Sequence, residues 1–402
     1  MRIIYFSDHF YPELGGIQDC LVVLAREFGI RGHEVVVCAP FAAPNDYALA
    51  NRPVREVDLG GNVTIRRFFS LPFPSSTRQS RLLVPTGRRW RGLAGFNPDV
   101  IHTHSFFGAG FEAISAARRL RVPLIGTNHW AIGEFGAYAP VSRTFFARKS
   151  ISAVTRFYGR CDFVSGPSRS VIDEMRDFGL RQPHAVVSNP IDTSVFHPVS
   201  PDRKRELKRR LSFTNATILY AGRLAVEKNI DVLIRAIAAM CTDVPEVMFA
   251  LAGHGSARSR LEALARDIGV ADRVKFLGTL DQTSLAEAFQ AADVFAIAST
   301  SETQSMVLLQ AMSSGLTAVG ARWRSLGEYI PNDCGFLAEP GRSDDFAQKL
   351  TAILKQPSLR QHMSDNAIRF AAGFAVANVI KMWTDIYAAA IRDFRGQAFR
   401  VT

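Results

Sequence analysis

The chain has 402 residues, of which 47% are hydrophobic and 21% charged. This balance excludes disordered and fibrous proteins, and the length suggests two or three globular domains. The formal net charge of +11 leaves nucleic acid, an anionic membrane surface and acidic substrates open as partners.

The five cysteines lie far apart, with no C-x-x-C pair and no histidine at zinc-ligand spacing. We therefore expect neither a disulfide framework nor a metal knuckle. The first apolar run is shorter than that of a signal peptide, and no stretch reaches the ~20 apolar residues of a membrane helix. These features predict a cytoplasmic protein.

Short, β-rich apolar runs alternate with helix-length stretches in the first half of the chain. This alternation is typical of a parallel sheet covered by helices on both faces. The predicted strands span residues 2–6, 34–40, 63–69, 99–104, 122–127 and 162–166.

The same alternation restarts after a proline-rich and then highly charged stretch, residues 188–213. The second set of predicted strands spans residues 217–222, 246–253, 273–278, 293–299, 316–320 and 335–340. We predict an α/β protein with two doubly wound domains, residues 1–195 and 196–375, that face a central cleft and bind a ligand outside the carboxyl ends of the strands. The amphipathic stretch at residues 374–394 predicts a helix in the last segment, 376–402, which would pack back across the domain junction onto the first domain.

The positive charge is concentrated between Asp58 and Asp99, where no acidic residue occurs. This region holds Arg66, Arg67, Arg78, Arg81, Arg88, Arg89 and Arg91, with Leu82, Leu83, Trp90 and Leu93 among the last five. Such a mixture in residues 78–93 suits an amphipathic segment on an anionic membrane surface, and a solvated basic loop is the alternative. Nucleic acid is disfavoured because the segment has no recognition motif and a single tryptophan.

Two groups of residues beside predicted strands suit a diphosphate. Gly15 and Gly16 precede a helix whose N-terminal amides suit an anion, although a plain tight turn explains a glycine pair alone. Arg223 follows a strand and Lys228 precedes a helix, so both cations are expected at the carboxyl edge of the second sheet. A nicotinamide enzyme is disfavoured, because the nearest approach to a G-x-G-x-x-G fingerprint has Arg258 in place of its third glycine.

A third group follows the strand at residues 293–299. Glu302 falls in the loop, and Gln310 is expected about two turns into the next helix, roughly 9 to 12 Å away along its axis. That separation would let one side chain reach a sugar and the other a ribose. The amides of Thr303, Gln304, Ser305 and Met306, at the helix start, would face the diphosphate between them.

In this order, the motifs resemble those of the family 4 retaining glycosyltransferases, which have the GT-B architecture of two Rossmann-like domains around a nucleotide-sugar cleft. The resemblance covers nearly the whole chain. Its signatures are PELGGIQ (12–18), TNH (127–129), SNPID (188–192), AGRLAVEKNID (221–231), LAGHGSARSRLE (251–262), VKFLGTL (274–280) and SETQSMVLLQAMSSG (301–315).

The resemblance implies that Arg223 and Lys228 hold the donor diphosphate, that Glu302 contacts the transferred sugar and that His129 borders the reaction centre. It also places the base near residues 274–278. The expected catalytic residues are His129, Glu302, Arg223 and Lys228. The expected donor contacts are Gly15, Gly16, Asn189, Gly222, Arg223, Lys228, Gly253, Leu277, Thr303, Gln304, Ser305, Met306 and Gln310.

Three positions depart from the family pattern. The family motif is Glu-x7-Glu, and the second glutamate, which usually holds the ribose hydroxyls, is Gln310 here. Pro190 stands where the family often has glycine, and His254 where it often has aspartate. The effect of Gln310 on donor binding is therefore open.

His129 ends a predicted strand, so its imidazole would donate to a sugar hydroxyl or stabilise the developing charge, and a capping histidine is the plain alternative. His102 and His104 lack a partner at metal-ligand spacing, so we interpret them as structural or acceptor-side residues. The chain has no Asp-x-Asp, so arginine, lysine and a helix dipole would replace a cation clamp. We expect a metal-independent enzyme with no cofactor other than its nucleotide-sugar co-substrate.

The leading hypothesis is a peripheral enzyme at the inner face of the cytoplasmic membrane. It would transfer a sugar with retention from a nucleotide-sugar, with UDP favoured over GDP, to a lipid or lipid-linked acceptor in glycolipid or polysaccharide biosynthesis. Two alternatives stay open: a soluble glycosyltransferase with a small acceptor, and a non-catalytic nucleotide-sugar-binding protein, which Gln310 suggests.

Overall fold

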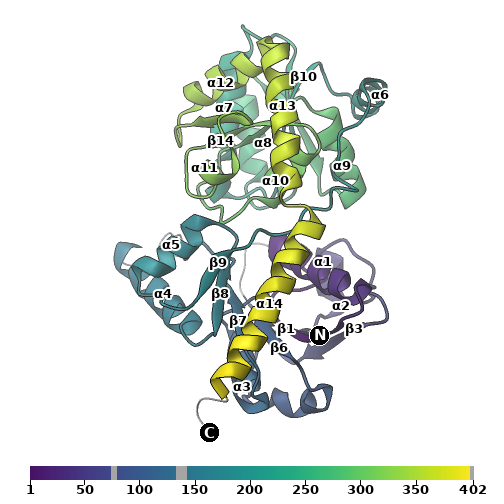
Figure 1. Cartoon of the computed structure of the whole chain (residues 1–402). Helices are drawn as coiled ribbons and strands as arrows, with labels where there is room; N and C mark the ends of the chain where they lie inside the picture. The colour runs from purple at the N-terminus through teal and green to yellow at the C-terminus, as the bar shows by residue number, and fades with distance from the viewer. Residues whose placement is uncertain (74–78, 133–142, 399–402) are drawn as a thin grey trace. The chain divides into compact units, whose positions relative to one another are not determined.

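A computed structural model describes residues 1–73, 79–132 and 143–398. The chain divides into two compact units (Figure 1). Unit 1 comprises Met1–Pro190 and Ala377–Thr402, and unit 2 comprises Ile191–Val376. The division after Pro190 falls slightly before the position that the sequence suggested.

Unit 1 is built on a seven-stranded parallel sheet in the order β3-β2-β1-β6-β7-β8-β9. Its strands are β1 (Arg2–Phe6), β2 (Glu34–Pro40), β3 (Val63–Phe68), β6 (Val100–Thr103), β7 (Leu124–Thr127), β8 (Phe163–Gly166) and β9 (His184–Val186). Its helices are α1 (Gly16–Ile30), α2 (Pro44–Leu49), α3 (Gly108–Leu120), α4 (Arg143–Tyr158) and α5 (Arg169–Asp177). The central strands are almost entirely buried because helices cover both faces of the sheet.

A small antiparallel hairpin also belongs to unit 1. Its strands are β4 (Ser70–Pro72) and β5 (Arg81–Leu83), which pair with Leu71 opposite Leu82.

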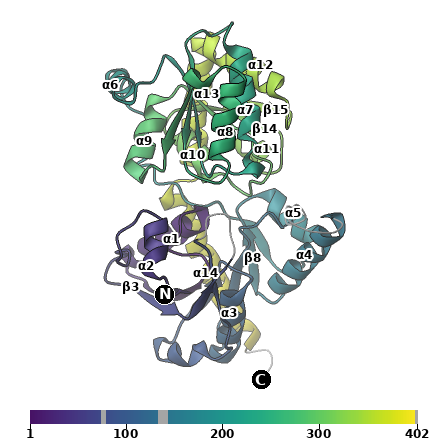
Figure 2. The same cartoon turned by 180° about the vertical axis from the view of Figure 1, so that it is seen from behind.

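The last helix, α14 (Val376–Ala398), lies across the sheet of unit 1 in both views (Figures 1 and 2). Tyr387 is fully buried, and its hydroxyl is hydrogen-bonded to Tyr5 of β1 at 3.2 Å and to His102 of β6 at 2.8 Å. Its ring also lies beside that of Phe28 in α1. Helix α14 therefore forms part of the core of unit 1 through Tyr387.

Unit 2 has a six-stranded parallel sheet in the order β12-β11-β10-β13-β14-β15. Its strands are β10 (Ala216–Ala221), β11 (Val247–Ala252), β12 (Val274–Gly278), β13 (Val294–Ile297), β14 (Thr317–Ala321) and β15 (Gly335–Ala338). Its helices are α6 (Pro201–Leu211), α7 (Ile230–Met240), α8 (Arg258–Asp267), α9 (Gln282–Ala291), α10 (Met306–Ser313), α11 (Leu326–Tyr329), α12 (Ser343–Lys355) and α13 (Pro357–Ala372). The core is one continuous apolar cluster around Ile218, Phe249 and Phe295.

The two doubly wound parallel sheets and all of the strands predicted from the sequence are confirmed, with ends that differ by a few residues. In each sheet the strand order reverses beside the first strand, between β1 and β6 in unit 1 and between β10 and β13 in unit 2. Ligands of such sheets bind outside the carboxyl ends of the strands at this reversal.

In the parts of the chain that the structure describes, no helix combines the length and the apolar character that crossing a membrane requires.

Candidate functional site

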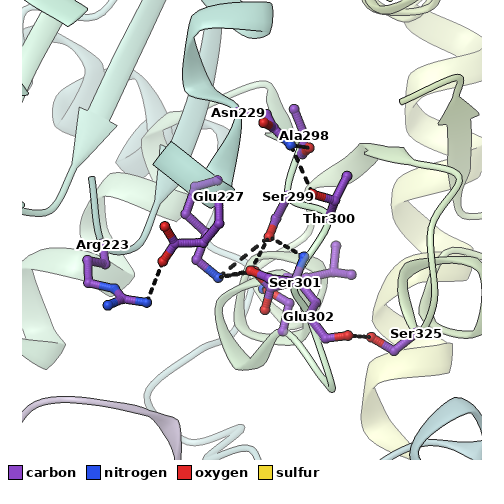
Figure 3. A network of polar contacts seen from close by, with 12 residues as sticks. Arg223, Glu227, Asn229, Ala298, Ser299, Thr300, Ser301, Glu302 and Ser325 are labelled. Atoms are coloured by element: carbon purple, nitrogen blue, oxygen red, sulfur yellow. Dashed lines mark hydrogen bonds and ion pairs between the residues drawn. The ribbon is translucent and has the colours of Figure 1, made fainter. Parts of the chain in front are cut away.

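The reversal of strand order in unit 2 brings together three of the residues predicted to contact the donor. Arg223 and Lys228 lie in the segment after β10, and Glu302 lies in the loop after β13, the neighbouring strand. Figure 3 shows Arg223 and Glu302 in this region. The backbone carbonyl of Glu302 accepts a hydrogen bond from Ser325 at 2.9 Å, which fixes the loop. The predicted convergence at this edge of the sheet is thus present in unit 2.

Lys228 and Glu302 form a half-buried ion pair. The Lys228 Nζ lies 2.6 Å from Glu302 Oε1 and within 3.5 Å of the hydroxyl oxygens of Ser299 and Ser301. Burial alone would raise the pKa of Glu302, but the charge and hydrogen bond of Lys228, with smaller contributions from Ser299 and Arg223, hold that pKa below its usual value. Glu302 is therefore a carboxylate at neutral pH.

Arg223 is paired with a carboxylate that the sequence analysis did not single out. Its Nη2 donates to Glu227 Oε1 at 2.7 Å, and its backbone carbonyl accepts from the buried Tyr220 hydroxyl at 3.0 Å (Figure 3 for the ion pair). The signal for Glu227 was its spacing of four residues from Arg223, a common ion-pair spacing. Both cations expected at the diphosphate are thus matched by a neighbouring carboxylate.

Two glycines allow the loops of this edge to approach one another. The N–H of Gly222 donates to the carbonyl of Ala252, and the N–H of Gly253 donates to that of Gly278. Gly253 has φ of 144°, and a Cβ there would lie 1.9 Å from the Gly222 carbonyl oxygen. Any side chain at 253 would therefore push the loop of Arg223 out of place.

Helix α10 begins with a capped turn. The Ser305 side chain accepts a hydrogen bond from the N–H of Leu308 at 3.3 Å, so the amides of Met306 and Val307 are the ones at the helix start. Thr303 and Gln304 precede the N-cap, which corrects the prediction that their amides are at the helix start. Gln310 accordingly lies just over one turn into α10 and not two, because residues 303–305 form the loop and its cap.

In unit 1, three histidines follow three strands at the carboxyl edge of the sheet: His9 after β1, His104 after β6 and His129 after β7. His129 Nε2 lies 2.9 Å from His104 Nδ1, and the two rings are stacked. Burial, helped by the nearby His9, lowers the pKa of His129 to about 3. His129 is therefore a neutral imidazole at neutral pH.

His102 and His104 have different surroundings, although the sequence analysis grouped them. His102 is structural, because its two ring nitrogens are hydrogen-bonded to Tyr387 and to Thr127 in the core. His104 contacts His129. In the described residues, no group of three histidine, cysteine, aspartate or glutamate side chains is placed to hold a metal ion.

The loop after β1 contains a buried ion pair that the sequence analysis missed. His9 Nδ1 lies 2.8 Å from Glu13 Oε2, and the ring of His9 packs against that of Trp130, next to His129. Burial opposes charge on His9, but the carboxylates of Glu13 and Asp8 raise its pKa.

Gly15 is the N-cap of α1, and Gly16 is its first residue. The remaining predicted donor contacts are Asn189, which is buried in the last residues of unit 1 before Pro190, and Leu277, which is half-buried in β12.

The basic segment at residues 78–93 is not one amphipathic element. Arg81 is paired with Asp46 at 3.0 Å, and Arg89 donates to the Val84 carbonyl and lies beside the buried Glu112. Leu83 and Leu93 are fully buried. Much of the alternation of arginine and leucine thus serves the interior of unit 1. This corrects the prediction of a membrane-facing segment for Arg81, Leu83, Arg89 and Leu93. Arg78 lies outside the described residues.

The sequence matches two known protein families. Residues 14–195 match the family described as "Glycosyltransferase Family 4", and residues 203–370 match the family described as "Glycosyl transferases group 1". The chain belongs to the family 4 glycosyltransferases. Its second motif glutamate is replaced by Gln310, so the family assignment rests on the wider match and not on Glu-x7-Glu.

Two curated relatives illustrate which proteins the chain is similar to. The alpha-monoglucosyldiacylglycerol synthase of Streptococcus pneumoniae is 25% identical over 90% of the chain and 80% of its own length. The D-inositol 3-phosphate glycosyltransferase 2 of Catenulispora acidiphila is 27% identical over 99% of the chain and 97% of its own length.

Among solved structures, HepE of Anabaena in complex with UDP matches with a TM-score of 0.77 at 20% identity, over 97% of this chain and 100% of that one. The match supports the GT-B fold of the enzyme, with its two Rossmann-like sheets.

Proposed function

We propose that this glycosyltransferase moves a sugar, with retention of configuration, from a nucleotide-sugar to a lipid or lipid-linked acceptor. The observation that carries the proposal is the Lys228–Glu302 pair beside Arg223 at the strand reversal of unit 2. Two cations and the start of α10 suit a diphosphate, and a carboxylate among them suits a sugar whose anomeric carbon gains positive charge.

In this proposal Arg223, Lys228 and the amides of Met306 and Val307 neutralise the leaving diphosphate, and Glu302 contacts the transferred sugar. Neutral His129 would hydrogen-bond a sugar hydroxyl. The nucleotide-sugar is a co-substrate, and neither a metal nor a further cofactor is needed, because the cations and the helix dipole supply the positive charge.

The proposed reaction takes place on one face of the sugar. The bond from the anomeric carbon to the diphosphate oxygen breaks while the acceptor oxygen forms a new bond on the same face. The acceptor proton passes to a phosphate oxygen of the leaving nucleoside diphosphate. No covalent enzyme intermediate is required, so the protein contributes positioning and charge stabilisation.

Support for a UDP-sugar comes from the similarity to HepE, which is in complex with UDP, and support for a lipid acceptor comes from the similarity to the alpha-monoglucosyldiacylglycerol synthase. The inositol phosphate relative favours a second candidate, a transferase with a small soluble acceptor. With a lipid acceptor, the enzyme would work at the inner face of the cytoplasmic membrane.

The test is a panel of UDP- and GDP-sugars incubated with the purified protein and either a membrane lipid extract or small phosphorylated polyols, with products identified by mass spectrometry. We expect a glycolipid product with a UDP-sugar, also in the presence of EDTA. A product from the polyols alone would support the second candidate, and an activity that EDTA abolishes would contradict the metal-free site.

Replacing Arg223 by alanine is expected to weaken UDP binding by about tenfold or more, because a charge-assisted hydrogen bond contributes roughly 1.5 to 3 kcal/mol. The matched control is Glu227→Gln, which removes the carboxylate that shares this guanidinium. It should preserve or tighten UDP binding in calorimetry. Equal weakening by both variants would contradict the assignment of Arg223 to the diphosphate.

Replacing Gln310 by glutamate tests the non-catalytic alternative. A carboxylate accepts from both ribose hydroxyls with charge assistance, whereas the amide offers one acceptor and one donor, so donor KM should fall or stay unchanged. The chemistry is remote from the ribose, so kcat should change little. If the wild type shows no transfer or donor hydrolysis and Gln310→Glu acquires transfer, the protein is a binding protein.

A further inference from the structure

The β4–β5 hairpin of unit 1 presents large apolar side chains to solvent. Phe69, Leu71 and Phe73 are 66%, 52% and 49% exposed. Leu71 lies in β4, and Phe69 and Phe73 flank it; they alternate with Ser70, which is buried, and Pro72, which is exposed. The N–H of Phe73 donates to the carbonyl of Ser80 and that of Val84 to the carbonyl of Phe69, so the antiparallel pairing continues beyond both ends of β4 and the three side chains share one face. Leu82 lies opposite Leu71 across the hairpin and is half-buried.

The opposite face of the hairpin is already occupied by the interior of unit 1. Ser70 donates to the carbonyl of Phe41, and the N–H of Leu83 donates to the buried carboxylate of Asp8. The outward stripe is therefore not needed to hold the hairpin in place. From the exposed fractions and about 200 Å² per aromatic side chain, the three outward residues expose roughly 300 Å² of apolar surface, the size at which patches on monomers are often functional.

The surroundings of this stripe are positively charged. Arg66, Arg88 and Arg91 are exposed, and the guanidinium of Arg66 donates to the carbonyl of Gly92, which places the segment of Arg88 and Arg91 beside β3 and the start of the hairpin. No acidic residue occurs between Asp58 and Asp99. The acids that lie near this segment, Asp46 and Glu56, are paired with Arg81 and Arg67. An apolar stripe with further exposed cations beside it complements a surface that is apolar inside and anionic outside.

We propose that the outward face of the hairpin, with Phe69, Leu71 and Phe73, inserts into the interfacial layer of an anionic lipid bilayer. The inference rests on the proposed function in so far as a lipid acceptor requires a bilayer. It assigns the contact to the hairpin face in place of Arg81, Arg89 and Leu83, which the interior uses. Exposed arginines beside it would contact lipid phosphates.

The experiment measures sedimentation of the full-length protein, without donor, with vesicles of phosphatidylcholine containing or lacking about 30% phosphatidylglycerol. We expect binding to the anionic vesicles and weaker binding to the neutral ones. The triple variant Phe69→Ser, Leu71→Ser, Phe73→Ser should lower the partition coefficient by at least about tenfold. The matched control replaces three exposed aromatics on α3 and α4, Phe111, Phe145 and Phe146, by serine and should bind within about twofold of the wild type.

A second readout does not depend on the stability of the triple variant. The emission maximum of the tryptophan introduced by Leu71→Trp should shift to shorter wavelength when anionic vesicles are added. The emission maximum of the tryptophan introduced by Phe145→Trp should not shift. Undiminished sedimentation of the triple variant, loss confined to the α3 and α4 variant, or an unshifted Leu71→Trp would overturn the inference. So would a wild-type dimer that the triple variant dissociates, because a second copy would then be the occupant.

Failure of this inference and failure of the proposed function have different signatures. Transfer to a short-chain, water-soluble lipid acceptor without vesicle binding leaves the function intact and overturns the hairpin contact. Vesicle binding that depends on the hairpin, in a protein that transfers no sugar, would support the hairpin contact and contradict the proposed function.

Discussion

Replacing Glu302 by glutamine is expected to lower kcat by at least roughly a hundredfold, because removing one preorganised charge beside a charged transition state typically has an effect of this size. Donor affinity should be preserved or improved. The carboxylate lies 2.6 Å from Lys228 Nζ, so its loss leaves the ammonium free to face the diphosphate. Steady-state kinetics and calorimetric titration with UDP would separate the two effects.

The matched control for Glu302→Gln is Glu227→Gln, the same chemical change at the carboxylate paired with the other cation. It should leave kcat within about threefold of the wild type, because Glu227 is assigned no contact with the sugar. Equal losses of kcat in both variants would indicate that the two ion pairs only maintain the loops, and would contradict the role of Glu302.

Replacing Asp293 by alanine is expected to destabilise unit 2 by about 3 to 5 kcal/mol, since it leaves a buried ammonium without its partner. Asp293 precedes β13 and is 5% exposed. It accepts hydrogen bonds from Lys208 of α6 and from the N–H of Thr217. Burial, together with the neighbouring cations Lys204 and Arg360, lowers the pKa of Lys208 despite this pairing.

Urea unfolding would measure this loss. Asp385→Ala in the exposed Lys381–Asp385 pair of α14 is the control and should change stability by less than about 1 kcal/mol. Lys208→Met should cost less in the Asp293→Ala background than in the wild type, because the uncompensated charge is then removed. Equal costs in both backgrounds would mean that Lys208 and Asp293 are energetically independent.

The sequence was sufficient for the strands and for the place of the cations, because both follow local patterns. A buried parallel strand is a short apolar run, and a residue directly after it lies at the carboxyl edge of the sheet, as Arg223 and Glu302 do. The exceptions are β4, β5 and β9, which the sequence analysis did not predict, because they have only three residues each, too few for a periodic pattern.

What the sequence did not supply was the partner of each charge. The alternation of arginine and leucine in residues 78–93 is equally compatible with a surface and with an interior, and only tertiary contacts assign Arg81 to Asp46. The sequence analysis also placed the start of α10 too early: the helix is capped by Ser305, so Gln310 lies about one turn nearer to the helix start than expected.

The burial of Tyr387 in unit 1 sets the order in which the protein can fold during synthesis. Unit 2 is a single continuous segment, whereas unit 1 needs residues from both ends of the chain. Tyr5 and His102 are made before unit 2, whereas Tyr387, whose hydroxyl both contact, is made after it. The core of unit 1 therefore stays incomplete while unit 2 is translated, and it can be completed only when α14 has been synthesised and packs against the sheet.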